Sequence, residues 1–356
     1  MKKTMNTKIV LSLLMSGAVC MSGIYGVQAQ DITINGNDEY KNVNLTGDGN
    51  TVTISGVTQV DDTIIAGSGS NNNTKITDSK FKLVYGAVGD KVSGNTVEVS
   101  GTEAEIGYNS KNSKDEHYSI IGGQASATGE ASRNEVIIRN GIFSGTVVGG
   151  MAEQGKDADT KTGSAVGNKV IVYGGTVSSG ISSSISTAVQ GGVANAGEAK
   201  NNEVHIYGGT IQNHIVGGES QIGNVIGNKV VIGDANDTYG TNHAIEIERQ
   251  IYGGKVVRND DSIIEVEGAA MDNSVEIHGG IIKKSVTGGW AAEGDVAYNK
   301  VIVDGGTTAD LSGGKTNDGN ARYNKVIVRG DAEVGVLKGG DSQMGVVSYN
   351  EVLLEG

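Results

Sequence analysis

The sequence of 356 residues predicts an all-β fold, a parallel β-solenoid in which short strands stack coil upon coil. Three observations predict it: a repeat of about 26 residues, alternating β-branched residues within each repeat, and a composition of 57 Gly without Pro. Proline cannot donate a ladder hydrogen bond, so its absence fits strands that are paired on both sides. The glycines lack an every-third-residue period, which excludes collagen, and 37% hydrophobic residues is too many for a disordered chain.

Residues 1–29 are predicted to form a secretory signal peptide. The apolar run from Ile9 to Val19 is too short to span a bilayer, and Val27-Gln28-Ala29 fits a small-residue cleavage site. We therefore expect the mature chain to begin at Gln30. A lipoprotein signal is the alternative because Cys20 follows the apolar run, although Val19 stands where a small residue is expected. The basic start of the segment comprises Lys2, Lys3 and Lys8.

The charge balance limits the partners. The chain has 28 basic and 41 acidic residues. Removal of the leader takes away three lysines and the one cysteine, so the mature chain has 25 basic and 41 acidic residues. Nucleic acids and anionic membranes are bound mainly through clustered lysine and arginine, so neither is an expected partner. An exported chain without disulfides must gain its stability from its core. No later apolar run reaches about 18 residues, so no transmembrane helix is predicted.

An Asn-x-Val tripeptide marks each repeat. The shortest intervals between copies are 25 and 26 residues, and the longer intervals indicate inserted loops. Stacking the repeats about 4.8 Å apart would place the asparagines in one column, where side-chain amides can bond from coil to coil. The predicted column comprises Asn95, Asn134, Asn168, Asn202, Asn228, Asn273, Asn299, Asn324 and Asn350.

The strand that follows each asparagine alternates. Side chains two and four positions past the asparagine are β-branched and are predicted to point inward, and the side chain five positions past it outward. One internal column is expected to contain Val170, Val204, Val230, Val275, Val301 and Val326. The outward positions include Tyr173, Tyr207, His278, Asp304 and Arg329.

Two glycine pairs divide each repeat. One pair ends the first strand, as at Gly209, and another ends a second short strand, as at Gly217-Gly218. Both pairs are interpreted as corners that need a positive φ. Ten residues then lead from the second pair to the next asparagine, as from Gly218 to Asn228, and this constant arc indicates a coil of fixed circumference.

The domain boundaries follow from the repeat. Residues 30–83 are expected to form an N-terminal cap with irregular first coils, although residues 50–56 resemble a coil strand. Residues 84–356 are expected to form the repeat solenoid, with loops inserted at 154–167 and from 234 onward. The repeat stops inside a unit at the last residue, so we expect a fragment, a truncated reading frame, or a chain that depends on a separate translocator.

The leader, the cysteine-free mature chain and the Val-x-Gly-Gly…Asn-x-Val-x-Ile-x-Gly-Gly repeats resemble the passenger of a Gram-negative autotransporter. The resemblance covers residues 84–356. It implies a right-handed single-stranded β-helix that an outer-membrane β-barrel carries to the cell surface. Many such passengers are adhesins or surface-coat proteins. Phe81 and Phe143 are the only phenylalanines, which leaves no aromatic girdle for a barrel within this sequence.

We therefore expect an exported cell-surface protein with a structural or adhesive role and no cofactor. Arg329-Gly330-Asp331 is an integrin-type adhesion tripeptide at a repeat corner, where it should be exposed toward a host surface or another cell. A coat repeat without a specific ligand is one alternative. The other is a polysaccharide lyase or hydrolase, for which Asp304 and Arg329 hold equivalent positions in adjacent repeats. No second acid completes a catalytic set, so a surface ion pair is expected there.

Three further patterns are interpreted as structural. Ala309–Thr316 resembles a phosphate-binding loop, but it falls on a repeat corner rather than before a helix. Residues 234–237 lack the late glutamate that completes a calcium loop. His205 and His278 are expected to be solvent-exposed, and no histidine forms a His-x-x-x-His pair, so no metal site is predicted.

Overall fold

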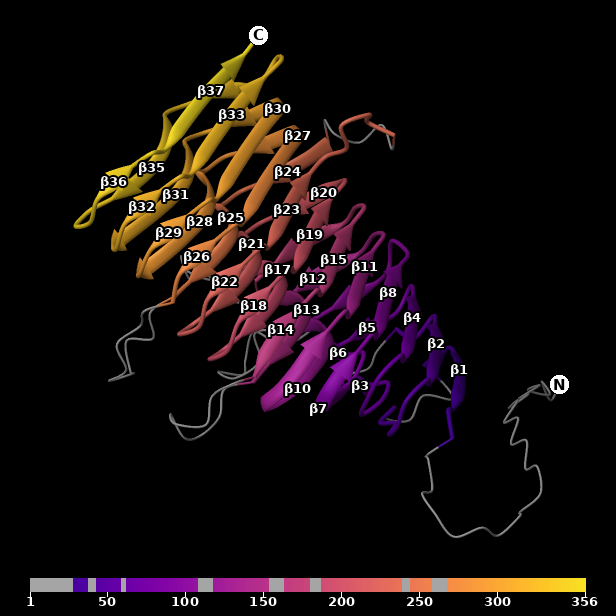
Figure 1. Ribbon diagram of the computed structural model, residues 1–356. Coiled ribbons are helices and arrows are strands. Elements are labelled where there is room, and N and C mark those ends of the chain that lie inside the picture. Colours follow the sequence, from indigo (N-terminus) through magenta and orange to yellow (C-terminus); the bar gives the residue numbers. More distant parts are fainter. Residues whose placement is uncertain are drawn as a thin grey trace, which may run out of the picture.

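The computed structural model describes residues 28–37, 43–58, 62–107, 118–153, 163–179, 187–238, 244–257 and 268–356, which form a parallel β-solenoid (Figure 1). The predicted fold class is confirmed. Coils stack along one axis from the indigo N-terminal strands to the yellow C-terminal strands. The described residues contain no helix long and apolar enough to cross a membrane. Except for its last two residues, the predicted signal peptide lies outside these ranges.

Sheet A contains two strands from each coil, one after the asparagine and one after the next corner. The first kind comprises β2 (Thr51–Ser55), β4 (Asn73–Thr77), β8 (Thr96–Ser100), β11 (Glu135–Ile138), β15 (Lys169–Val172), β19 (Glu203–Ile206), β23 (Lys229–Ile232), β27 (Ser274–Ile282), β30 (Lys300–Thr308), β33 (Lys325–Arg329) and β37 (Glu351–Glu355), preceded by β1 (Asp31–Asn35). The second kind comprises β5 (Lys80–Phe81), β9 (Glu105–Ile106), β12 (Ile142–Ser144), β16 (Thr176–Ser178), β20 (Gly209–Ile211), β24 (Ile245–Ile247) and β34 (Glu333–Val334). Strands β27 and β30 continue through the corner, so each pairs with strands of both the first and the second kind.

Sheet B closes the coil on the other side. Its first strands are β3 (Thr63–Ile65), β6 (Leu83–Tyr85), β10 (Tyr118–Ser132), β13 (Thr146–Ala152), β17 (Thr187–Ala194), β21 (His214–Ser220), β25 (Ile251–Val256), β28 (Val286–Glu293), β31 (Leu311–Asp318) and β35 (Leu337–Ser342). Its second strands are β7 (Val88–Ser93), β14 (Ser164–Val166), β18 (Ala199–Lys200), β22 (Val225–Ile226), β26 (Ala270–Met271), β29 (Val296–Ala297), β32 (Ala321–Arg322) and β36 (Val347–Ser348). The chain therefore alternates between two parallel sheets that enclose the core.

The predicted valine column is confirmed. Its six members are fully buried and pair in register from β15 to β33, so each packs against its equivalent in the next coil. Burial of one such side chain contributes about 1.5 kcal/mol. Larger side chains fill the core near the N-terminal coils, where Phe81 and Phe143 are fully buried. One continuous hydrophobic cluster extends from Ile34 to Val328.

The asparagine column is confirmed and is longer than predicted. It also contains Asn50 and Asn72, because sheet A keeps a five-residue register from β1 through β2 and β4 to β8. Asn228 is representative: its Oδ1 accepts the backbone N–H and the side-chain Nδ2 of Asn202, both at 3.0 Å. Its Nδ2 donates to Oδ1 of Asn273 and to the carbonyl of Ala199, both at 2.9 Å. Each asparagine thus joins three coils.

The two glycine pairs have different physical causes, and for one pair the predicted cause is wrong. At the sheet A corner the positive φ is confirmed, as at Gly209 with φ +94°. The pair in sheet B lies inside a strand, as Gly217-Gly218 in β21, and neither residue has a positive φ. There a Cβ on Gly218 would lie 2.3 Å from the Asn228 amide, and one on Gly217 2.3 Å from the carbonyl oxygen of Gly253. The asparagine column at Gly218 and neighbouring backbone at Gly217, not a corner, exclude side chains at this pair.

Candidate binding surface

The outer face of sheet B carries the chemically most varied side chains that the structure describes. Both glycines of the sheet B pair face inward, against the asparagine column and the adjacent backbone, so the side chains flanking the pair point outward. The residues after the pair are aligned by register from β21 to β35. This row comprises Glu219, Lys255, Trp290, Lys315 and Asp341.

Glu219 and Lys255 form an ion pair near the middle of this face. The Nζ of Lys255 lies 3.6 Å from Oε2 of Glu219, and the two side chains are only 11% and 17% exposed. The same Nζ lies 5.5 Å from the ring centroid of Tyr252. Lys255 is therefore neutralised by a carboxylate and packed against an aromatic ring, and both contacts hold its side chain in place.

Aromatic rings continue this cluster along the solenoid. His214 and Tyr252 have ring centroids 6.1 Å apart, and Tyr252 meets Trp290 edge to face at 6.3 Å. Burial, with a smaller contribution from the Glu219 charge, raises the pKa of Tyr252 to about 12. The same two causes raise the pKa of Tyr118 to about 12. Both phenols therefore remain neutral hydrogen-bonding groups at physiological pH.

Trp290 lies between two lysines. Its register partners are Lys255 in the preceding coil and Lys315 in the following one, and the indole is partly exposed. Lys315 makes no ion pair with another residue in the described ranges. Its register neighbour Asp341 is held instead by Lys338, at 2.9 Å between Nζ and Oδ2. The row thus offers a ring and one cation without an anionic partner among those residues.

Lysines on the outer face of sheet A are arranged differently. Several meet a glutamate of a nearby strand, as Lys229 meets Glu276 at 2.8 Å and Lys325 meets Glu351 at 2.8 Å. Lys325 and Glu351 hold equivalent positions on adjacent coils, whereas Glu276 lies two residues past Ser274, the register partner of Lys229. Lys315 has no such carboxylate partner among the described residues and lies beside Trp290, which makes it a candidate for binding an anion.

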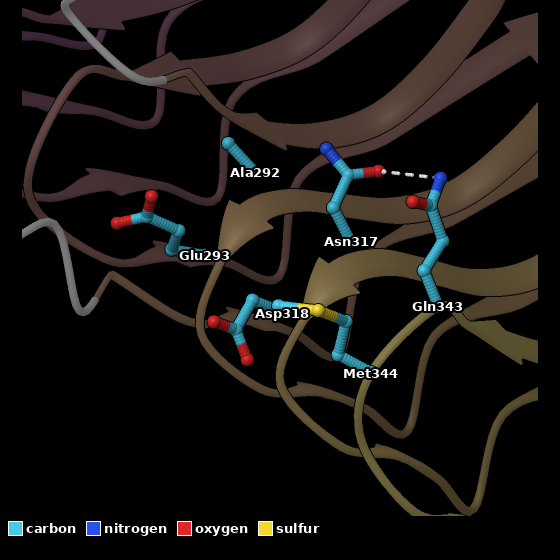
Figure 2. A pocket seen from close by; sticks show the side chains of 6 residues that line it. All are labelled: Ala292, Glu293, Asn317, Asp318, Gln343 and Met344. Carbon is cyan, nitrogen blue, oxygen red and sulfur yellow. Dashed lines mark hydrogen bonds between the residues drawn. The ribbon is translucent and has the colours of Figure 1, made fainter.

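A second feature is a shallow hollow at the edge of the C-terminal coils (Figure 2). Its volume is about 360 Å³, and Glu293 and Asp318 lie opposite each other in register at its rim. Nε2 of Gln343 donates to Oδ1 of Asn317 at 3.3 Å on the other side. No group of three metal-ligating side chains occurs among the described residues, so the two carboxylates alone define no metal centre. The hollow is lined by Ala292, Glu293, Asn317, Asp318, Gln343 and Met344.

The adhesion tripeptide lies where its corner position predicts. Arg329 ends β33, Gly330 has φ +57°, and all three residues of the tripeptide, through Asp331, are exposed. The Arg329 guanidinium is engaged, however, because its Nε donates to Oε2 of Glu355 at 2.6 Å. The Asp331 side chain makes no hydrogen bond or ion pair with another described residue.

The expected pair of Asp304 with Arg329 does not form. Asp304 accepts instead from Nδ1 of His278 at 2.7 Å, on the preceding coil. The expectation that His205 and His278 are solvent-exposed is wrong, since their side chains are 14% and 15% exposed. Neighbouring coils lie close enough to cover an outward imidazole, and Glu203 binds Nε2 of His205 at 2.8 Å.

The other two patterns take ordinary structural forms. Gly313-Gly314 of the phosphate-loop resemblance lies inside β31, so no helix N-terminus follows it. Asp234 caps a tight turn, where its carboxylate accepts backbone N–H groups of Asn236 at 3.2 Å and Thr238 at 2.8 Å. Hydrogen bonds with Thr238 and Asn236 lower the pKa of Asp234.

Sequence reasoning missed the row around Trp290 because it assigned the sheet B glycine pairs to corners. A signal was present: Trp290 is the only tryptophan, and it directly follows a glycine pair, as Lys255 and Lys315 do. No family model, no curated protein and no solved structure matches this chain.

Proposed function

We propose that this chain is an exported cell-surface solenoid, the passenger part of an autotransporter-like protein, with a structural or adhesive role. The observation that carries the proposal is the continuous column from Asn50 to Asn350. It ties every coil to its neighbours through buried hydrogen bonds, which suits an extended scaffold that must hold its shape outside the cell.

The outer side chains supply the adhesive part of the proposal. In a solenoid each coil contacts only its neighbours, so the outward positions can change without disturbing the fold. Trp290 and the exposed Asp331 corner are two such positions on different coils. The partner at these positions would be a host surface or another cell.

The export part rests on the sequence. A leader followed by a mature chain without cysteine suits secretion through a barrel, because no disulfide can close a loop before translocation. The proposed partner is an outer-membrane β-barrel translocator, either attached or separate. Coil-on-coil contacts would let folding spread as the chain emerges.

The test is to join residues 30–356 to a translocator barrel behind the native leader. We expect the solenoid to become accessible to added protease on intact cells, and cells displaying it to attach to host cells or to each other more than cells with the barrel alone. Display without increased attachment would reject the adhesive role and leave the structural one. Retention of the chain inside the cell would reject the export proposal.

A further inference from the structure

Trp290 and Lys315 combine two chemistries on adjacent coils of the outer face of sheet B. The indole is a broad apolar surface that is partly exposed, and Lys315 is a cation without an anionic partner among the described residues. Register sets the two side chains about 4.8 Å apart along the solenoid. A ligand that fits both must present an apolar face and, next to it, a negative charge.

We infer that this surface binds a carboxylated sugar, with the pyranose ring packed on Trp290 and its carboxylate paired with Lys315. A pyranose ring presents C–H groups on one face, which pack against an aromatic ring, and hydroxyl groups around its rim. A lysine ammonium forms a charge-assisted hydrogen bond with a carboxylate. The inference rests on the proposed adhesive function and names the ligand class for it.

The neighbouring residues assign different roles to the two lysines. Lys255 already has the Glu219 carboxylate at 3.6 Å and the Tyr252 ring against its Nζ, so it supports the site and does not bind the ligand's charge. Tyr252 packs edge to face with Trp290 at 6.3 Å and fixes the indole from the side. The Tyr252 phenol, with its raised pKa, stays neutral and adds no negative charge near the ligand.

Charge favours a sugar acid over a nucleic acid. Single-stranded nucleic acids also stack on aromatic rings, but they need a basic groove that follows the phosphate backbone. The row around Trp290 offers one unpaired lysine among the described residues, and the whole chain has a net charge of −13. A single carboxylate on a short glycan matches one lysine, whereas a row of phosphates would be repelled.

Fluorescence of Trp290 provides a direct test, because it is the only tryptophan in the chain. The purified mature protein would be titrated with galacturonate and with sialyllactose, each of which carries one carboxylate, and lactose would serve as the neutral probe. We expect a saturable change in emission with at least one acidic glycan and none with lactose at the same concentration. The two acidic probes distinguish a uronic acid from a sialic acid.

Variants then separate the site from general electrostatics. Lys315→Gln is expected to weaken binding about tenfold, whereas Lys315→Arg should retain it, since either cation can pair with a carboxylate. Lys300→Gln, which removes the same charge from the outer face of sheet A, is the matched control and should bind like the wild type. Trp290→Leu, followed by calorimetry, should also lose about tenfold.

Equal affinity of the wild type and Lys315→Gln, an equal response to lactose, or tighter binding of a short oligonucleotide would each overturn the inference. Because these titrations use protein in solution, they do not depend on surface display. Binding without display would reject only the proposed export, and display with attachment but without glycan binding would reject only the ligand class.

Discussion

The corner before each sheet A strand has an inner and an outer side, and the two follow different rules. The inner residue is asparagine in all eleven coils from Asn50 to Asn350. The residue just before it points outward and varies among glycine, asparagine, arginine, aspartate and tyrosine, yet its φ always lies between +53° and +72°. The asparagine column therefore sets the backbone of the corner, and the residue on its outer side must adopt a left-handed conformation, which glycine and asparagine tolerate well and arginine and tyrosine do not favour.

The largest expected effect comes from breaking the inner side. Asn228→Ala removes the acceptor of the Asn202 backbone N–H and of one of the two Nδ2 hydrogens of Asn202, whose other hydrogen still donates to the carbonyl of Ala165. We expect a loss of about 3 kcal/mol in the free energy of unfolding, measured by urea denaturation. A loss below about 1 kcal/mol would mean that the column contributes little to stability.

A second substitution tests the contact between this column and sheet B. Gly218→Ala places a Cβ 2.3 Å from the Asn228 amide and is expected to cost roughly 2 kcal/mol. In the Asn228→Ala background the same change should cost much less, because the clashing amide is gone. Gly174→Ala, whose nearest neighbour would lie at 3.1 Å, is the control and should cost less. Additive costs for Gly218 and Asn228 would disprove the contact.

A third prediction concerns pH on the outer face. The hydrogen bond from His205, together with the charges of His205 and Lys169, lowers the pKa of Glu203 from 4.5 to about 2. Because the folded pKa is the lower one, the stabilisation is present above pH 4.5 and is lost as the pH falls from 4.5 toward 2. The carboxylate is 42% exposed, so the effect should stay below about 1 kcal/mol.

Denaturation midpoints between pH 2 and 7 provide the measurement. Glu203→Gln should flatten the stability profile below pH 4.5, and Glu135→Gln, two coils away in the same row, should leave that part of the profile unchanged. Identical profiles for the two variants would show that the pair with His205 contributes nothing.

The smallest effect is expected on the outer side of the corner. Tyr298, Tyr323 and Tyr349 are exposed and stack with ring centroids 5.0 Å apart, although each has a positive φ. Tyr323→Ala removes two stacking contacts and keeps the strain, so it should cost about 1 kcal/mol. Tyr323→Asn removes the same contacts but suits the left-handed conformation, so it should be roughly 0.5 kcal/mol more stable than the alanine variant. Equal stabilities, measured by thermal denaturation, would show that strain at this corner is negligible.

The difference between the inner and outer sides of the coil also explains which features could be predicted from the sequence. The valine and asparagine columns were predictable because Val204, Asn202 and their equivalents have the same surroundings in every coil, so the same residue recurs there. The role of the sheet B glycines was not predictable, because the same Gly-Gly dipeptide forms a left-handed corner at Gly209 and a close packing contact at Gly218.

The candidate binding surface around Trp290 could not be predicted from the sequence. Trp290 meets Lys255 and Lys315 through register alone, and the number of residues between them depends on the length of each inserted loop. No local pattern connects such residues, because outer side chains carry no periodic requirement. The partners of Asp304 and Arg329 show the same limit, since equivalent positions did not make them a pair.

The hydrogen bonds between successive asparagines of the column all run in one direction, which restricts the symmetry of any assembly. The backbone N–H of each asparagine, joined from Asn72 onward by its Nδ2, donates to Oδ1 of the next asparagine, and the series begins with the N–H of Gln30 on Oδ1 of Asn50. Two columns meeting head to head would oppose donors with donors or acceptors with acceptors. A two-fold axis across such a junction is therefore unfavourable, and only a head-to-tail junction, which is heterologous and can propagate, would continue the bonding.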